Sequence, residues 1–222
     1  MNEMIERPAS NLAEDWMFLV FLFCTATLAY TRSSYPARIS RLWNSMWNVR
    51  IMRQAIREEP NTPRANLLFN VSFYLLASLI VFLTLKRYGI GILGTSGSLM
   101  YVLLLTCLVV AYAVKSVGIR VVQMLGHGDF GLTEYEYNIF LMNRGLSLFL
   151  LPVAALLAYL PLQMLGYFFV AAAFIFALMV VYRMVRGLLN AASQSLPVFY
   201  IFFYICTLEI LPMVVCVKAL SH

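Results

Sequence analysis

Long apolar runs, separated by short polar links, constrain this chain more than any other feature of its sequence. The runs cover residues of about 16–30, 66–85, 99–117, 138–159, 165–182 and 197–217. A helix of roughly 20 apolar residues is long enough to cross the hydrocarbon core of a bilayer. Because a spanning segment must satisfy its backbone hydrogen bonds internally, such runs predict helices. The pattern predicts an all-α, polytopic membrane helix bundle with about six transmembrane helices.

The composition agrees with this class and leaves little chain for anything else. Hydrophobic residues make up 62% of the sequence, charged residues make up 12%, and the mean hydropathy is +0.82. A soluble globular domain is about half apolar and about a quarter charged. The composition therefore excludes an ordinary soluble protein, and we expect one integral membrane domain over residues 1–222.

The link after the first run has a different character, because residues 32–65 contain seven arginines and no lysine. Apolar residues recur there at three- and four-residue spacing, and polar residues fall on the opposite side. This pattern predicts a basic amphipathic helix over about 37–57 that lies in the headgroup plane of an anionic leaflet. A helix that binds a protein partner is the alternative. The residues expected at the membrane surface are Arg38, Arg41, Trp43, Trp47 and Arg50.

The basic residues also predict an orientation. If the N-terminus is external, twelve of the 16 Lys and Arg residues fall on or toward the cytoplasmic side. The four on the other side are Arg7, Lys86, Arg87 and Lys218. This asymmetry follows the positive-inside rule, so we expect both termini in the periplasm of an inner membrane. The net charge of +6 is explained by orientation in the bilayer and does not predict nucleic-acid binding.

One acidic residue lies deep inside an apolar run. Glu209 is about twelve residues into the last run, which places it roughly 18 Å from the cytoplasmic end. A lone charge at that depth is costly, so the carboxyl must be protonated, paired or facing water. We expect Glu209 to pair with Arg144, which begins roughly 9 Å closer to the cytoplasmic surface. The other polar candidates inside the bundle are Lys115, Asn143 and Asn70.

Two prolines lie inside predicted spans and should bend them. Pro212 leaves the carbonyl of Leu208 without its helical donor, next to Glu209, and Pro152 lies within the fourth span. A buried ion pair that fixes helix packing explains this polar site with the fewest groups. A proton- or ion-coupled pathway and an intramembrane catalytic site remain alternatives. Transport routes usually contain several ionisable groups, and the predicted spans hold few.

The sequence gives no indication of a cofactor or a metal centre. The four cysteines lie in apolar runs, without Cys-x-x-Cys spacing, and are expected to be buried small residues. A cluster between the third and fourth spans could bind a metal, but its residues fit a solvated turn and a helix cap better. That cluster comprises His127, Asp129, Glu134 and Glu136.

The run from Tyr204 to Pro212, Tyr-Ile-Cys-Thr-Leu-Glu-Ile-Leu-Pro, resembles the C-terminal signature of an uncharacterised Bacteroidota inner-membrane family, domain of unknown function 4271. The resemblance extends over most of the chain from the first helix. It implies a small polytopic protein of the inner membrane. Other positions that are similar to the family are Lys115, Glu134-Tyr135, Asn143-Arg144-Gly145, Leu151-Pro152 and Arg183 to Arg186.

These features favour a non-enzymatic role over a catalytic one. The leading interpretation is a scaffold or assembly component of an envelope complex, with a membrane-protein partner or a second copy of the chain beside it in the lipid bilayer. A small proton- or ion-coupled transporter or channel is the alternative, and an intramembrane lipid-acting enzyme is the third. A hydrolase would require paired carboxylates, a metal set or a nucleophile with a base, and neither histidine lies inside a span.

Overall fold

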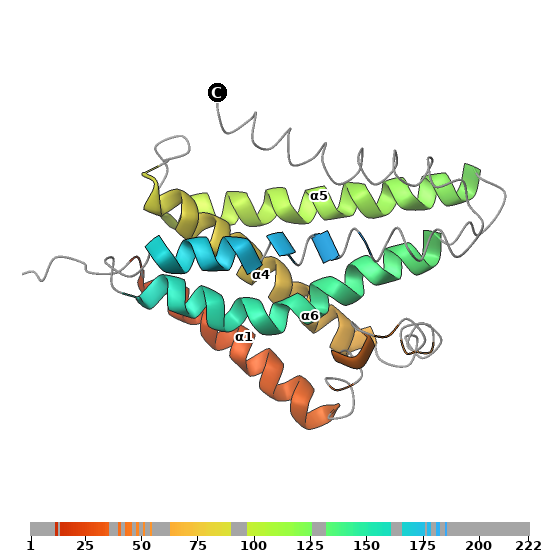
Figure 1. The fold of residues 1–222 in the computed structure, drawn as a ribbon, viewed down its shortest axis with the longest axis horizontal. Coiled ribbons are helices and arrows are strands. Elements are labelled where there is room, and N and C mark those ends of the chain that lie inside the picture. Colours follow the sequence, from red (N-terminus) through yellow and green to blue (C-terminus); the bar gives the residue numbers. More distant parts are fainter. Residues whose placement is uncertain are drawn as a thin grey trace, which may run out of the picture.

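The structure is a computed structural model, and it is all-helical over the residues that it describes. Those residues are 12, 14–35, 40, 43–45, 48, 51, 54, 63–89, 97–125, 132–160, 166–175, 177, 178, 181, 182 and 185. Four long helices make up most of them: α1 (Asp15–Ser34), α4 (Pro63–Arg87), α5 (Gly97–Leu125) and α6 (Leu132–Tyr159). Figure 1 shows them as a bundle in which helices that follow one another along the chain run in opposite directions.

Four of the six predicted spans correspond to these helices. The segments long and apolar enough to cross a membrane are Asp15–Ser34, Asn66–Arg87, Gly97–Gly118 and Ile139–Tyr159. The predicted span at 165–182 coincides in part with a shorter apolar helix, Gly166–Ile175. The predicted span at 197–217 lies outside the described residues. The membrane class is therefore supported by four helices, and the number six stays a prediction.

The ends of the helices follow from local backbone bonds. Glu14 has an extended backbone and caps α1, where its carbonyl accepts a hydrogen bond of 2.9 Å from the Met17 amide. At the other end of the next long helix, Gly89 adopts a φ of +67° and its amide bonds to the carbonyl of Lys86 at 3.2 Å. A glycine in this left-handed conformation is a common way to stop a helix. α4 therefore ends at Arg87, directly after Lys86.

α4 and α6 form the centre of the bundle. α4 packs against α1, α5 and α6, and its most extensive contact is with α6. Large side chains that are almost fully buried come from both helices, including Phe69, Leu76 and Phe82 of α4 and Leu141 and Leu157 of α6. α5 lies at the side, because only 11% of its membrane segment is buried, against 44% for α4 and 56% for α6.

The basic segment at 37–57 is described at residues 40, 43–45, 48, 51 and 54, and all of these except Asn48 are helical. Trp43 is 42% exposed, and its ring lies 5.5 Å from the ring of Phe149 on α6. Ser45 was expected on the polar side of this helix but is fully buried. The segment therefore contacts α6 at Trp43, and the hydroxyl of Ser45 does not face the headgroups. Arg38, Arg41, Trp47 and Arg50 are outside the described residues.

Candidate functional site

Arg144 is the most buried charged residue among those described, with 4% of its surface exposed. It lies on α6, five residues inside the membrane segment that begins at Ile139. At 1.5 Å per residue, Arg144 is therefore about 7 Å from the end of that segment. Its Nε donates a hydrogen bond of 3.3 Å to the Oδ1 of Asn70 on α4, and its guanidinium carbon lies 6.0 Å from the ring centre of Tyr137. Arg144 makes further interactions besides these. The side chain therefore joins the two central helices.

A third helix, α5, contacts the other two at the depth of Arg144. The hydroxyl of Tyr112 on α5 donates a long hydrogen bond of 3.5 Å to the Oδ1 of Asn143. The Tyr112 ring also lies against two α4 rings, with centroids 5.8 Å from Phe73 and 5.3 Å from Tyr74. Asn143 is 1% exposed, so its amide is held inside the bundle beside Arg144.

The first helix, α1, joins α4 through a pair of hydroxyls. Thr27 on α1 and Ser72 on α4 are buried and lie 2.9 Å apart, and the Thr27 hydroxyl also lies 2.8 Å from the carbonyl of Cys24. Counted along each helix at 1.5 Å per residue, the residues in the contacts between these helices lie roughly 6 to 10 Å from one end of their membrane segments. Those segment ends are Ser34, Asn66, Gly118 and Ile139. We call this set the Arg144 layer; its members are Thr27, Asn70, Ser72, Tyr112, Asn143 and Arg144.

The structure places the other predicted site residues as follows. Lys115 is half-buried on α5, one helical turn beyond Tyr112, and engages in interactions of its own. Pro152 lies inside α6, which continues to Tyr159, so the proline does not end the helix. Glu209 and Pro212 lie outside the described residues, and the pairing of Glu209 with Arg144 stays a prediction.

The chemistry of the Arg144 layer is that of recognition and packing. It contains one cation, amides and hydroxyls, and a buried guanidinium binds carboxylates or phosphates well. Among the residues that the structure describes, no group of three His, Cys, Asp or Glu side chains could hold a metal ion. Of the four residues weighed as metal ligands and interpreted as a turn and a helix cap, Glu134 and Glu136 are in the first turns of α6, and His127 and Asp129 lie outside the described residues.

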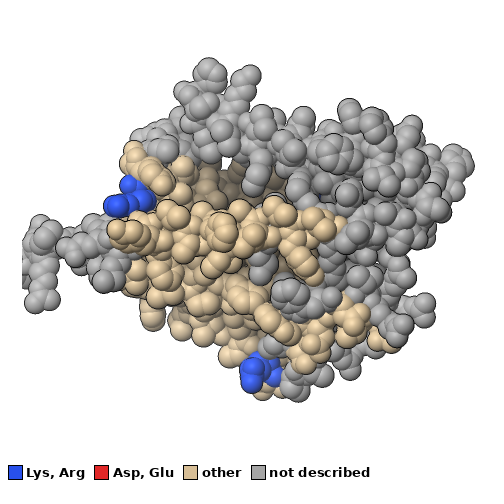
Figure 2. Space-filling view, in the orientation of Figure 1, with Lys and Arg blue, Asp and Glu red and all other residues tan. Residues whose placement is uncertain are grey.

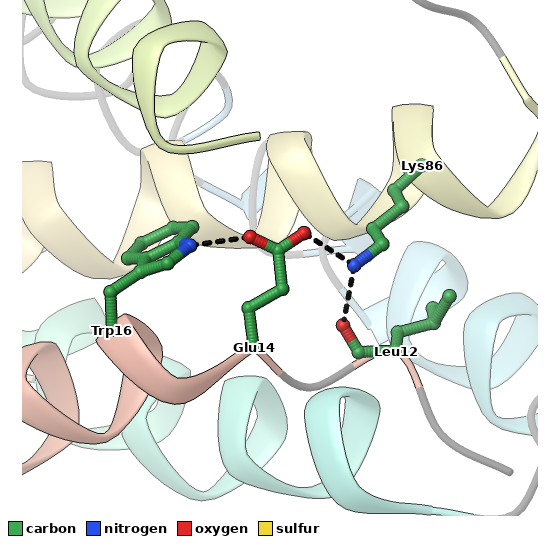
Figure 3. A network of polar contacts seen from close by, with 4 residues as sticks. All are labelled: Leu12, Glu14, Trp16 and Lys86. Atoms are coloured by element: carbon green, nitrogen blue, oxygen red, sulfur yellow. Dashed lines mark hydrogen bonds and ion pairs between the residues drawn. The ribbon is translucent and has the colours of Figure 1, made fainter. Parts of the chain in front are cut away.

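A second polar site lies at the opposite end of the bundle, and Figure 3 shows its hydrogen bonds. The Nζ of Lys86, at the end of α4, donates to Oε1 of Glu14 at 2.6 Å and to the carbonyl of Leu12 at 3.1 Å. The indole Nε1 of Trp16 donates to the other carboxylate oxygen of Glu14. The Trp16 ring packs against Tyr101 of α5, with centroids 4.7 Å apart.

The start of α5 completes this second site. A Cβ atom placed on Gly97 would lie 2.7 Å from each carboxylate oxygen of Glu14, which is too close for a van der Waals contact. We call Leu12, Glu14, Trp16, Lys86 and Gly97 the Glu14 clamp. Partial burial raises the pKa of the Glu14 carboxyl, but the bonds from Lys86 and Trp16 and the positive charge of Lys86 outweigh it. The pKa therefore lies below its usual value, and Glu14 is ionised at neutral pH.

Comparison with known proteins decides the family. The model of the family described as domain of unknown function DUF4271 matches residues 17–220. The chain belongs to the DUF4271 family. No curated protein and no solved structure gives a match.

Two parts of this DUF4271 protein were not anticipated from its sequence. The Glu14 clamp was missed because its acid lies in a polar tail and its base follows an apolar run, where each looks like an ordinary solvated charge. The useful signal was that Glu14 and Lys86 fall on the same predicted side of the membrane. Tyr112, Thr27 and Ser72 were missed because hydroxyl groups are common in membrane helices and carry no spacing signal.

Proposed function

We propose that this protein is a non-enzymatic, multi-pass component of the inner membrane that serves as a scaffold or assembly partner in an envelope complex. One observation carries the proposal: the buried polar contacts of the Arg144 layer and the partly exposed contacts of the Glu14 clamp join one helix to another. Polar groups used in this way hold a bundle in one arrangement, which a scaffold requires. Buried polar contacts between helices also specify which helices pack together.

The orientation that we propose places both termini and the Glu14 clamp in the periplasm and the basic segment at 37–57 in the cytoplasm. Arg32, at the end of α1, and Arg120, near the end of α5, then lie at the cytoplasmic end of the bundle. On the face that Figure 2 shows, the described residues present no Asp or Glu, and the Lys and Arg side chains that are visible lie at the margins. A membrane-impermeant thiol reagent tests the orientation: the thiol introduced by Arg38→Cys should stay unlabelled in intact cells and become labelled after lysis.

Glu209 and Arg144 are proposed to form a buried ion pair. The guanidinium of Arg144 is already oriented by Asn70, and a carboxylate is the partner that best compensates a buried guanidinium. We expect Glu209→Gln and Arg144→Gln each to lower the thermal stability and the protein level, and the double variant to lose less than the sum of the two. If both single variants match the wild-type protein, the pair does not exist.

A co-purification experiment tests the scaffold role. The tagged chain, expressed at its native level, is extracted in a mild detergent after brief cross-linking of the membranes. We expect one protein to be recovered in a fixed ratio to the chain. Arg144→Gln should reduce this recovery because it loosens the bundle, and Arg120→Gln, at an exposed position, should leave it unchanged. A chain recovered alone from cross-linked native membranes would rule out a scaffold.

Proton- or ion-coupled transport is the second candidate, because the Arg144 layer places polar groups of several helices at one level of the membrane. Reconstitution into liposomes separates the two functions. A transporter should dissipate an imposed proton or ion gradient faster than empty liposomes, and Arg144→Gln should abolish the difference. A scaffold should give the rate of empty liposomes.

A further inference from the structure

The outward side of α6 changes character halfway along its membrane segment. We call its exposed part the α6 outer stripe; its members are Phe149, Pro152, Leu156 and Tyr159. They recur at a spacing of three and four residues, so they share one side of the helix. Toward the Ile139 end of the segment, Gly145 and Met142 would continue the stripe, but both are buried. The outward side of α6 is therefore exposed only as far as Phe149.

α1 contacts the α6 outer stripe near the other end. The ring of Phe21 lies 5.9 Å from the ring of Tyr159, and Figure 1 shows α1 and α6 diverging from there toward the end of α1. Phe149 is ten residues from Tyr159, about 15 Å along the helix, in the part from which α1 diverges. The ring contact at Phe149 comes instead from Trp43, in the basic segment between α1 and α4.

Trp43 and Phe149 form one apolar surface on the outside of the bundle. Their ring centroids are 5.5 Å apart, and the two residues are 42% and 37% exposed. Two residues further along, Ser45 is fully buried. Residues two apart on a helix point to nearly opposite sides, so the turn is packed against protein on the side away from Trp43. Trp43 therefore lies on the outer side of a turn that is fixed to the bundle.

This surface lies at the level of the membrane. Phe149 is ten residues inside the segment Ile139–Tyr159, about 15 Å along α6. Because the side chains of a helix lean toward its N-terminus, the Phe149 ring lies closer to the Ile139 end than its backbone does. An amphipathic helix at a membrane boundary buries its apolar side by roughly 5 to 10 Å. A tryptophan ring on such a helix therefore reaches the level of the Phe149 ring.

Polar neighbours of Trp43 limit how deep its backbone lies. Asn44 and Asn48 are exposed, and the Asn48 amide donates a hydrogen bond of 2.9 Å to the carbonyl of Asn44. Exposed amide side chains are costly among acyl chains, so this turn belongs at the headgroup boundary. The segment also joins α1 to α4 at the end of the bundle where α6 begins, so it approaches the membrane from that side.

We propose that Trp43 anchors the basic segment to lipid: its indole ring faces the acyl chains beside Phe149, and the backbone of its turn stays at the headgroups. Acyl chains fit this surface because it consists of large apolar rings at membrane level and continues the α6 outer stripe. An indole also suits the boundary, where amphipathic aromatic rings are favoured. The proposal does not depend on the scaffold role, and the proposed orientation assigns the anchor to the inner leaflet.

The anchor and the proposed ion pair use different sides of α6. Arg144 is five residues before Phe149, which is about 140° around the helix. Its Nε bonds to Asn70 of α4, so its side chain is directed into the bundle. A Trp43 ring on the outer stripe therefore does not occupy the position proposed for Glu209.

Tryptophan fluorescence tests whether Trp43 contacts lipid. The chain has three tryptophans, so the variant Trp16→Phe/Trp47→Phe leaves Trp43 as the only one. It is reconstituted into phosphatidylcholine and phosphatidylglycerol vesicles whose acyl chains carry bromine, a contact quencher, and compared with unbrominated vesicles. We expect loss of most of the fluorescence with brominated lipid and little loss with aqueous iodide. A reference variant carries Phe149→Trp with all three native tryptophans changed to Phe, and it should respond in the same way.

Other quenching patterns overturn the proposal. Strong quenching by iodide with little effect of bromine would place Trp43 in water. Little quenching by either would mean that protein, including a second copy of the chain, covers the ring. These variants keep all four native cysteines and the Phe149 contact, so they leave the buried core unchanged.

Cross-linking tests the place of Trp43 on α6 independently. Trp43→Cys is combined with Phe149→Cys in a chain without native cysteines, with a protease site inserted in the 126–131 link. After treatment of membranes with a short bis-thiol reagent and cleavage, the two fragments should stay joined. The matched control replaces Phe149→Cys with Leu156→Cys, on the same stripe but two turns further, about 10 Å away. Its fragments should separate. Equal linking of both variants, or of neither, would show that Trp43 does not lie at Phe149.

Discussion

Lys86 and Glu14 are 72 residues apart in the chain, yet the Nζ of one lies 2.6 Å from the Oε1 of the other. Both side chains are about one-third exposed, so the ion pair lies at the edge of the bundle and is partly solvated. The pair joins the start of α1 to the end of α4, and Gly97 adds the start of α5. Three helix ends therefore meet at one carboxylate.

Glu14→Gln should destabilise the protein modestly. It removes the negative charge that holds Lys86, while the amide retains part of the bonding capacity. A partly exposed ion pair contributes about 0.5 to 1 kcal/mol, and we expect a double-mutant cycle with Lys86→Met to give a coupling energy in that range. The measurement is thermal unfolding in a mild detergent. Asp15→Asn, at an exposed position beside Glu14, is the matched control and should leave stability unchanged.

The same pair predicts how stability depends on pH. The pKa of Glu14 is lower in the folded protein than in the unfolded chain, so the ionised form stabilises the fold. This contribution is complete above the unfolded pKa of about 4.3 and is lost as the pH falls through the folded pKa. The stability difference between the wild-type protein and Glu14→Gln should therefore be constant from pH 7 to about pH 5 and shrink below about pH 4. A difference that grows as the pH falls would contradict the assigned ion pair.

Gly97→Ala should cost more stability than an ordinary glycine substitution. Replacing a helical glycine with alanine usually stabilises a helix by about 0.5 to 1 kcal/mol. At Gly97 the new methyl group would lie 2.7 Å from both carboxylate oxygens of Glu14, so the carboxylate must shift and its bonds to Lys86 and Trp16 are weakened. We expect a net loss of about 1 kcal/mol, measured by thermal unfolding.

The control for this change is Gly166→Ala, because a Cβ there meets nothing within 4 Å. It should be neutral or slightly stabilising. Combining Gly97→Ala with Glu14→Ala should remove the penalty of the first change, since the clashing carboxylate is then absent. A penalty that persists in the double variant would mean that the strain comes from another neighbour.

The helices themselves were predictable because the cost of exposing backbone in lipid makes long apolar runs helical. The predicted span at 66–85 corresponds to the observed segment Asn66–Arg87, and the span at 138–159 corresponds to Ile139–Tyr159. The sequence could predict that Asn70 and Arg144 lie at a similar depth in the membrane, but it could not predict the hydrogen bond between them. Each lies four or five residues inside its segment, but which faces of the helices meet depends on tertiary packing.

The surface features were less predictable. The spacing of Trp43 and Ser45 placed one toward lipid and the other toward water, but Trp43 is partly exposed against Phe149 and Ser45 is buried. An amphipathic pattern identifies two faces of a helix without saying whether lipid or protein covers the apolar one. Similarly, nothing in the sequence around Gly97 indicates that a carboxylate from another helix lies against its Cα.

Asn70→Ala should weaken the contact between α4 and α6. The change removes the acceptor that receives the Arg144 Nε at 3.3 Å and leaves a buried guanidinium less well satisfied. Losing a hydrogen bond to a buried charged group costs about 1 to 3 kcal/mol, so the melting temperature in detergent should fall by several degrees.

Asn70→Asp keeps an acceptor and adds a charge opposite to that of Arg144, so it should retain wild-type stability or exceed it. Thr106→Ala removes an exposed hydroxyl that bonds within its own helix and should change stability by less than about 0.5 kcal/mol. If Asn70→Ala is as stable as Thr106→Ala, then Asn70 does not hold Arg144 in place, because removing the acceptor of the Arg144 Nε has no cost.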